Sequence, residues 1–173
     1  MPATLILTVL AFVSLCILSD VHARRIPNPL SVAGMVAGLM LNIIHFGGAG
    51  IAASVAGFAL ATALLIAPFA AGGVGGGDVK MMAAVGAMLG PRLVTLSLGL
   101  GILLGGFIAV WFAARRGVLR RTLTGIVSRA RDAVLMRTLA PLRMLPADGS
   151  GLTLPYSIPL GLGAMLALLS VKP

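Results

Sequence analysis

The chain has 173 residues, of which 59% are hydrophobic and only 10% are charged. A water-soluble domain of this length cannot bury so much apolar surface, so most of the chain must be surrounded by lipid. The apolar runs are continuous rather than alternating, which excludes a β-barrel. The net charge of +9 comes largely from arginines in one segment beside the apolar runs, without a recognisable nucleic-acid-binding module, so membrane topology explains it better than nucleic-acid binding. Composition therefore predicts an all-α, polytopic membrane protein that forms a single domain over residues 1–173.

The first apolar run covers residues 2–19 and ends at Asp20. The following Val21-His22-Ala23 resembles the cleavage site of an export signal. However, no basic residue precedes the run, and Arg24 and Arg25 follow it, which is the reverse of the signal-peptide pattern. We therefore expect a retained first span with its N-terminus outside the cytoplasm.

Five further apolar runs follow, at residues 30–46, 50–70, 79–90, 93–112 and 154–171. With the first run they predict about six transmembrane helices, each of which needs about 20 residues to cross the bilayer upright. The fourth run ends after about a dozen residues at Gly90-Pro91-Arg92, so it is too short to cross unless the bilayer thins or its start dips inward. Tracing the chain from outside to inside places eleven of the thirteen Lys and Arg residues in the cytoplasm, which supports this orientation.

Glycines recur at four-residue spacing inside the apolar runs. Such spacing places them on one face of a helix, where they let a second helix backbone approach closely in lipid. The pairs are Gly34/Gly38, Gly86/Gly90 and Gly101/Gly105. We expect these positions to be helix contacts.

Residues 113–150 form a basic segment between the fifth and sixth runs, predicted to be a cytoplasmic loop. Within residues 118–134 the apolar side chains fall near one helical face, with Arg120, Arg121 and Arg131 opposite. This pattern predicts a helix that lies in the membrane surface and contacts anionic lipid headgroups.

The chain has few acidic residues: it has no glutamate, and its four aspartates are Asp20, Asp78, Asp132 and Asp148. Asp20 and Asp78 fall at the cytoplasmic edge of the predicted spans, at a similar depth, whereas the other two lie in the basic loop. A carboxylate at a membrane boundary is a candidate functional group. The alternative is structural, with Asp20 pairing with Arg24 at a helix end and Asp78 capping the fourth span.

Two carboxyl groups that lie close together do not readily both ionise, so they share a proton. The ionised partner can take a proton from water while the neutral one polarises a peptide carbonyl. This arrangement predicts peptide hydrolysis by Asp20 and Asp78 without a metal or another cofactor.

Three glycines, Gly75, Gly76 and Gly77, stand directly before Asp78. They allow a positive φ and the close approach of another backbone, such as an extended peptide. The Walker spacing of a phosphate-binding loop is absent. Lys80 follows, and either holds this loop in the cytoplasm or acts on the Asp78 carboxyl.

The segment after Asp20 has candidate roles of its own. Arg24 and Arg25 are interpreted mainly as residues that keep this end of the span in the cytoplasm. Contacts to a substrate or a carboxylate are their second candidate role. Pro27, with the proline two residues later, is expected to end the first helix. Asn28 is expected to satisfy the backbone groups freed there.

Three stretches resemble the type IV prepilin peptidases. "GGGDVKMMAAVGAMLG" resembles their GxGD motif, with Gly75, Gly77 and Asp78 at the motif positions; "SDVHARRIPNPLS" is similar to their other aspartate segment, and "LPYSIPLGLGAML" (154–166) to their last span. The resemblance implies an aspartic membrane endopeptidase whose catalytic residues are Asp20 and Asp78. Its substrate would be a prepilin, from which it removes a basic leader peptide at the cytoplasmic face of the bacterial inner membrane.

The short chain looks most like the CpaA/TadV-like branch, which serves Flp (tight-adherence) pili. Longer members carry a cysteine-rich cytoplasmic insert and also N-methylate the trimmed pilin. This chain has the single cysteine Cys16 and no such insert, which argues against methyltransferase activity.

Two other functions remain open at this point. One is a small transporter or permease subunit, which would place Asp20 and Asp78 deep in mid-span and show repeat symmetry between its halves. The other is a non-catalytic membrane component of a pilus or secretion assembly, which would tolerate replacement of either aspartate. The sequence predicts no oligomeric state.

Overall fold

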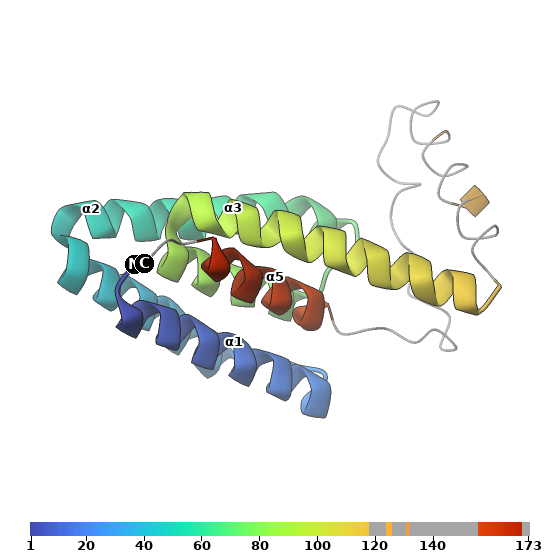
Figure 1. The fold of residues 1–173 in the computed structure, drawn as a ribbon, viewed down its shortest axis with the longest axis horizontal. Helices are drawn as coiled ribbons and strands as arrows, with labels where there is room; N and C mark the ends of the chain where they lie inside the picture. Colours follow the sequence, from blue (N-terminus) through green and yellow to red (C-terminus); the bar gives the residue numbers. More distant parts are fainter. Residues whose placement is uncertain (118–123, 126–130, 132–155, 171–173) are drawn as a thin grey trace.

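The computed structural model describes residues 1–117, 124–125, 131 and 156–170. The main elements within these ranges are α1 (Ala3–Ala23), α2 (Asn28–Ala70), α3 (Gly76–Arg115) and α5 (Ser157–Leu169), with no strand among them (Figure 1). The predicted all-α class is therefore confirmed. The predicted surface helix at 118–134 lies almost wholly outside the described residues.

The two longest helices each contain a break at a glycine. Gly47 in α2 has φ 57° and ψ −134°, and Gly90 in α3 has φ 74° and ψ 178°. Both φ values lie in the region that glycine alone adopts readily. The breaks fall at predicted boundaries between apolar runs. Because of them, α2 and α3 each double back, so that both ends of α2 lie at the same end of the bundle (Figure 1).

Asn42 stabilises the break in α3. Pro91 has no N–H, so the carbonyl of Ala87 lacks its usual helical donor. The Nδ2 of the buried Asn42 side chain donates to the carbonyl oxygens of Ala87 at 3.0 Å and Met88 at 3.1 Å, and to Gly38 of its own helix at 2.9 Å. A side chain of α2 thus supplies the donor that the break removes from α3.

Three of the described helices, α1, α2 and α3, are long and apolar enough to cross a membrane, whereas α5 is a shorter apolar helix. These lengths support the membrane class. The count of about six spans and the outside location of the N-terminus stay predictions.

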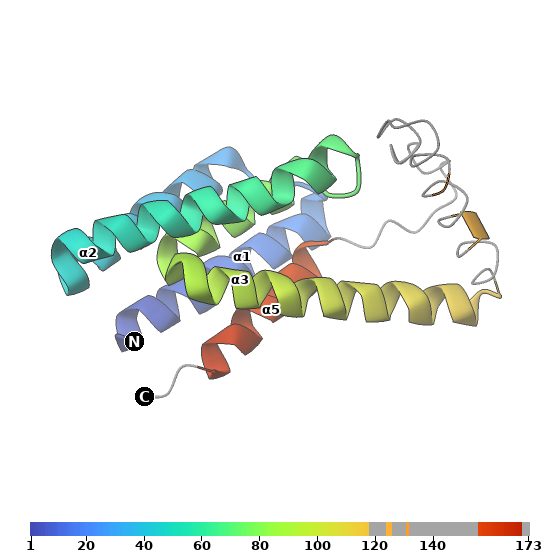
Figure 2. The ribbon, with the colours of Figure 1, turned by 90° about the horizontal axis from the view of Figure 1, so that it is seen from above.

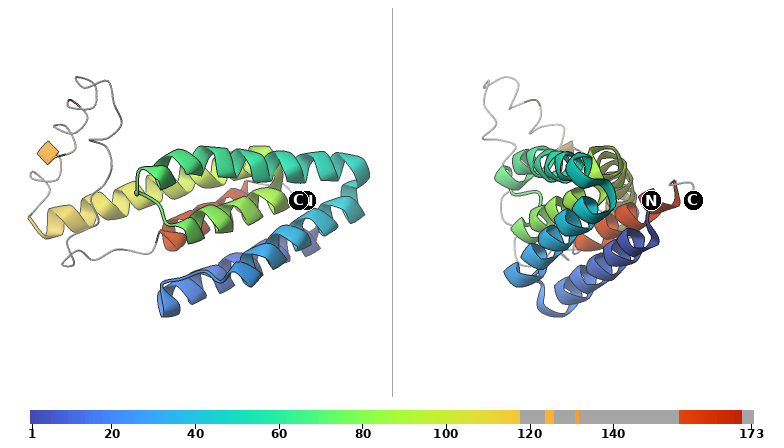
Figure 3. Two further views of the ribbon diagram at one scale, coloured as in Figure 1. Left: turned by 180° about the vertical axis from the view of Figure 1, so that it is seen from behind. Right: turned by 90° about the vertical axis from the view of Figure 1, so that its left-hand side faces the viewer.

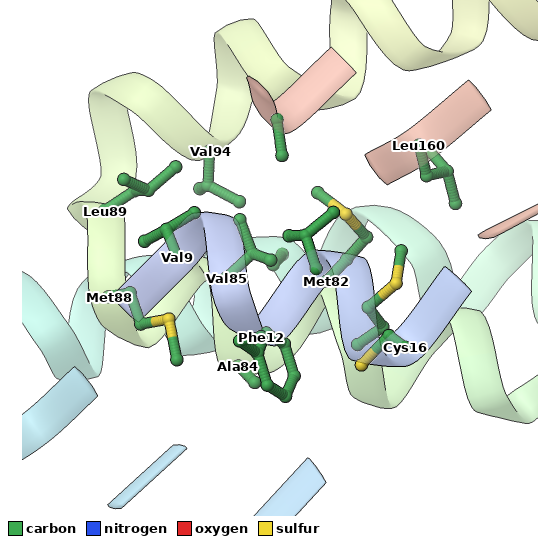
Figure 4. Packing of buried hydrophobic residues seen from close by; sticks show 14 of the residues in the cluster. Val9, Phe12, Cys16, Met82, Ala84, Val85, Met88, Leu89, Val94 and Leu160 are labelled. Carbon is green, nitrogen blue, oxygen red and sulfur yellow. The ribbon is translucent and has the colours of Figure 1, made fainter. Parts of the chain in front are cut away.

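The first half of α3 forms the centre of the bundle. Every residue from 81 to 90 is buried, as expected for a helix that is apolar on all sides. Its methionines and Val85 pack against Val9, Phe12 and Cys16 of α1 and against Leu160 of α5 (Figure 4). Asp78 therefore lies at the start of the most enclosed helix.

Glycines let these helices touch along their backbones. A Cβ on Gly57 of α2 would meet the carbonyl oxygen of Gly86 in α3, and a Cβ on Gly86 would meet that of Gly57. In the second half of α3, Gly101 packs against the Cα of Leu160, and α5 contacts both α1 and α3 (Figure 2). The expected contact role is confirmed for four of the predicted positions: Gly34, Gly38, Gly86 and Gly101. Gly90 forms the break and also lies against α2, because a Cβ on Gly57 would be 2.8 Å from its Cα, while a Cβ on Gly105 would make ordinary contact with Pro159 at 3.5 Å.

Candidate active site

Three helix ends meet at one end of the bundle. Asp20 lies in the last turn of α1, Asp78 in the first turn of α3, and Ser157 is the first residue of α5. Seen from behind, the turn between α2 and α3 lies at the same end as the start of α5 (Figure 3). The link that follows Asp20 contacts the start of α3, where Gly77 lies beside Ile26 and Lys80 bonds to Asn28, so Asp20 and Asp78 lie at the same end of the bundle. These are the two aspartates that the sequence singled out.

Asp78 is held by the start of its own helix. Its side chain is only 7% exposed, and its Oδ2 accepts a hydrogen bond from the backbone N–H of Gly75 at 3.3 Å. Gly75 occupies the N-cap position and Asp78 the third helical position, so the predicted capping role is confirmed in part: Asp78 caps the helix from its first turn, through the N–H of Gly75. A carboxylate at this position is favoured by the unpaired N–H groups of the first turn.

Asp20 is held by another helix. Its Oδ2 accepts a hydrogen bond of 2.5 Å from the hydroxyl of Ser157, which is fully buried. The alternative of an ion pair with Arg24 is not observed between these described residues: Arg24 instead donates its backbone N–H to the carbonyl oxygen of Asp20 at 2.7 Å. Sequence reasoning missed Ser157, whose signal was a hydroxyl at the start of an otherwise apolar run.

The glycines before Asp78 differ in how closely their neighbours approach. A Cβ on Gly75 would lie 3.1 Å from the Oδ2 of Asp78, and one on Gly77 would lie 3.4 Å from the Cβ of Ile26. A Cβ on Gly76 would be equally close to the Phe69 ring. The expected positive φ is not found at these three positions; within this turn it occurs at Gly72. A close approach that a side chain would disturb is therefore seen at Gly75, whereas a Cβ at Gly76 or Gly77 would make ordinary van der Waals contact.

Lys80 and Asn28 are joined to each other. The Nζ of Lys80 donates to the Oδ1 of Asn28 at 2.8 Å, which links the start of α3 to the start of α2. Whether Lys80 holds this loop in the cytoplasm or acts on the Asp78 carboxyl stays a prediction. The contact corrects the expected role of Asn28, whose oxygen accepts from a side chain.

The prolines begin a helix rather than end one. The first helix already ends at Ala23, with Arg24 in the left-handed conformation at φ 48°. Pro27 precedes the first residue of α2, and Pro29 lies in its first turn. The reason is that a fixed φ and a missing N–H suit the start of a helix, where that N–H has no partner.

The link between α1 and α2 is short and exposed. Arg24 and Arg25 are both exposed, and the hydroxyl of Ser19 donates to the carbonyl oxygen of Arg25 at 2.9 Å. Their guanidinium groups are therefore available to solvent, headgroups or a substrate. Within the described ranges, no group of three His, Cys, Asp or Glu side chains is placed to hold a metal ion.

Comparison with known proteins places this helical membrane protein in a family. The family model of the type IV leader peptidase family matches residues 7–110, a range that contains both aspartates, and the chain belongs to this family. The chain is similar to the prepilin leader peptidase/N-methyltransferase of Bacillus subtilis (strain 168), with 28% identity over 158 residues that cover 90% of this chain and 54% of the relative. It thus spans about half the length of that curated relative. No solved structure matches the chain.

Proposed function

We propose that this protein is an aspartic endopeptidase that removes the basic leader peptide from prepilins at the cytoplasmic face of the bacterial inner membrane. The observation that carries the proposal is the location of Asp20 and Asp78, in the last turn of α1 and the first turn of α3, at one end of the bundle in a member of the type IV leader peptidase family. Both aspartates lie in terminal turns rather than mid-helix. That location suits a peptidase better than a transporter that carries ions through the membrane centre.

The proposed chemistry uses one ionised and one protonated carboxyl group. The ionised carboxylate takes a proton from water as the water oxygen attacks the scissile carbonyl carbon. The protonated carboxyl donates to the carbonyl oxygen and stabilises the charge that develops there. When the tetrahedral intermediate collapses, the C–N bond breaks and the leaving amine receives a proton from the pair. No covalent enzyme intermediate is formed.

Helix lengths support a site recessed into the membrane. The first half of α3, from Gly76 to the break at Gly90, and the 13-residue α5 are each about 20 Å long. The hydrocarbon core is about 30 Å thick. Both helices begin at the aspartates, while the second half of α3 extends past that end of the bundle (Figure 1). A substrate with a membrane-spanning segment, such as a prepilin, can therefore lie beside the bundle and present its leader to the pair.

The side chains at the end of α3 suit a location at the membrane surface. The guanidinium carbon of Arg115 lies 4.9 Å from the centroid of the Trp111 ring. Tryptophan and arginine are typical of the boundary between lipid and water. We place the cytoplasmic boundary here and assign the basic segment 113–150 to contact with anionic lipid headgroups.

We further propose an Flp-type pilin as substrate and hydrolysis without N-methylation. The link between α1 and α2 consists only of residues 24–27, which leaves no room there for a cysteine-rich insert. The chain has the single cysteine Cys16, which is buried.

The test is leader removal in cells that co-express the chain and a candidate Flp-type prepilin, followed on a gel. Asp20→Ala and Asp78→Ala are expected to abolish processing while the protein still reaches the membrane. Asp132→Ala is the control, because this aspartate belongs to the basic segment, and it should process normally. Normal trimming by either of the first two variants would rule out the peptidase mechanism.

A further inference from the structure

We infer that Ser157 is a positioning residue that holds the Asp20 carboxyl group for catalysis, an inference that rests on the proposed peptidase function. The hydroxyl of Ser157 is fully buried and donates to Oδ2 of Asp20 at 2.5 Å. A hydrogen bond to a carboxylate is shorter and stronger than one between neutral groups. The contact joins the last described helix to the first.

The hydrogen bond of Ser157 differs from those of five other helical hydroxyls. A serine or threonine inside a helix commonly donates to the carbonyl oxygen four residues earlier. Five described residues do so: Thr8, Ser31, Thr62, Thr95 and Ser97. Ser157 stands in the first turn of α5 and donates to a side chain of another helix instead. Its hydroxyl therefore contributes to the site rather than to its own helix.

Packing one turn away holds Ser157 opposite Asp20. A Cβ on Gly161 of α5 would lie 2.7 Å from Cδ1 of Ile17 and 2.8 Å from Cγ1 of Val13, so α5 rests directly on α1 there. Ser157 precedes Gly161 by about one helical turn, and Asp20 follows Ile17 by about one turn. The two helices thus meet at a fixed register, and this register brings the hydroxyl to the carboxyl group.

The hydrogen bond from Ser157 fixes the orientation of the Asp20 side chain, which is only half-buried. With Oδ2 of Asp20 bound by Ser157, the other carboxyl oxygen, Oδ1, is left for the water or for the shared proton. Ser157 therefore acts through Asp20 and is assigned no contact with the scissile bond. Its loss should slow the chemical step and leave substrate binding unchanged.

The experiment measures kcat and KM for leader removal by the full chain in detergent, with a purified candidate prepilin. Ser157→Ala is expected to lower kcat by about 10- to 100-fold, the range for losing a hydrogen bond to a charged group, with KM unchanged. Ser157→Thr keeps the hydroxyl and should recover part of the loss. Ser97→Ala is the matched control, since Ser97 is also fully buried but bonds only to Leu93 of its own helix at 2.7 Å.

Three results would overturn the inference: an unchanged kcat in Ser157→Ala, an effect on KM alone, or an equal fall in kcat for Ser97→Ala. The absence of any recovery in Ser157→Thr, when it unfolds at the wild-type temperature, would also count against it. Asp20→Ala and Asp78→Ala are measured alongside. If they are inactive while Ser157→Ala is normal, only this inference fails; if either one cleaves normally, the proposed function itself fails.

Discussion

Lys80, which lies two residues beyond Asp78 at the start of α3, forms a hydrogen bond of 2.8 Å with Asn28 at the start of α2. The bond holds the link that follows Asp20 against the helix that carries Asp78. We therefore expect Lys80 to affect the two carboxyl groups through the position of these helix ends, a role that can be separated from a direct effect of its charge.

The first prediction concerns this bond. Lys80→Met and Asn28→Ala should each slow leader removal by about 2- to 10-fold, the range for one exposed hydrogen bond. The double variant should be no slower than the single ones, because both remove the same contact. Rates from timed gels give the comparison. A severe loss in Lys80→Met beside a normal Asn28→Ala would show that the lysine charge acts on Asp78 directly.

The second prediction tests the contact between Gly57 and Gly86. Gly57→Ala should lower the midpoint of thermal unfolding in detergent, because its methyl group would press on the carbonyl oxygen of Gly86. Overpacking of this kind costs about 1–3 kcal/mol. Gly99→Ala is the control, since a Cβ at Gly99 meets nothing within 4 Å. Equal midpoints for the two variants would contradict the close crossing of α2 and α3.

The third prediction concerns the donor at the break in α3. Asn42→Ala should destabilise the protein by about 1–3 kcal/mol, because the buried carbonyls of Ala87 and Met88 lose a partner. Asn42→Asp should be at least as harmful, since an ionised carboxylate of nearly the same shape has no N–H to donate. Thermal unfolding compares both with Thr62→Ala, whose hydroxyl bonds only to its own helix. A stable Asn42→Asp protein would refute the role of the side-chain donor.

The fourth prediction tests the orientation in the membrane. In a Cys16→Ser background, single cysteines at Ala23 and Gly73 should react with an impermeant thiol reagent only from the cytoplasmic side. A cysteine at Gly48, beside the break in α2, should react only from the outside. Labelling of whole cells and of inverted vesicles separates the two cases. Labelling of positions 23 and 73 from opposite sides would exclude a common site for Asp20 and Asp78.

Much of this architecture was predictable because the signals are local. Continuous apolar residues predict helices in lipid, and Gly90-Pro91 marks a break whatever surrounds it. Asp20 and Asp78 were identifiable because carboxylates are rare beside such runs. Their common location followed from an assumed alternation of spans, and the structure places both at the same end of the bundle.

The missed features depend on contacts between distant parts of the chain. Ser157 and Asn42 each act on another helix, and no pattern within their own segment specifies the partner. Pro27 was wrongly expected to end α1 because a proline stops a helix before it and equally starts one after it. Only the observed end of α1 at Ala23 distinguishes these alternatives.

The break at Gly47 determines where an insertion into the chain would affect the candidate active site. Because α2 returns to its starting side, residues 24–27 and 71–75, which connect α1 to α2 and α2 to α3, both border the aspartates. At the far side the chain reverses at Gly47 and Gly90 without leaving helical structure. We therefore expect an insertion into either connection to alter access to the carboxyl groups. The opposite end of the bundle, at Gly47 and Gly90, should keep its structure.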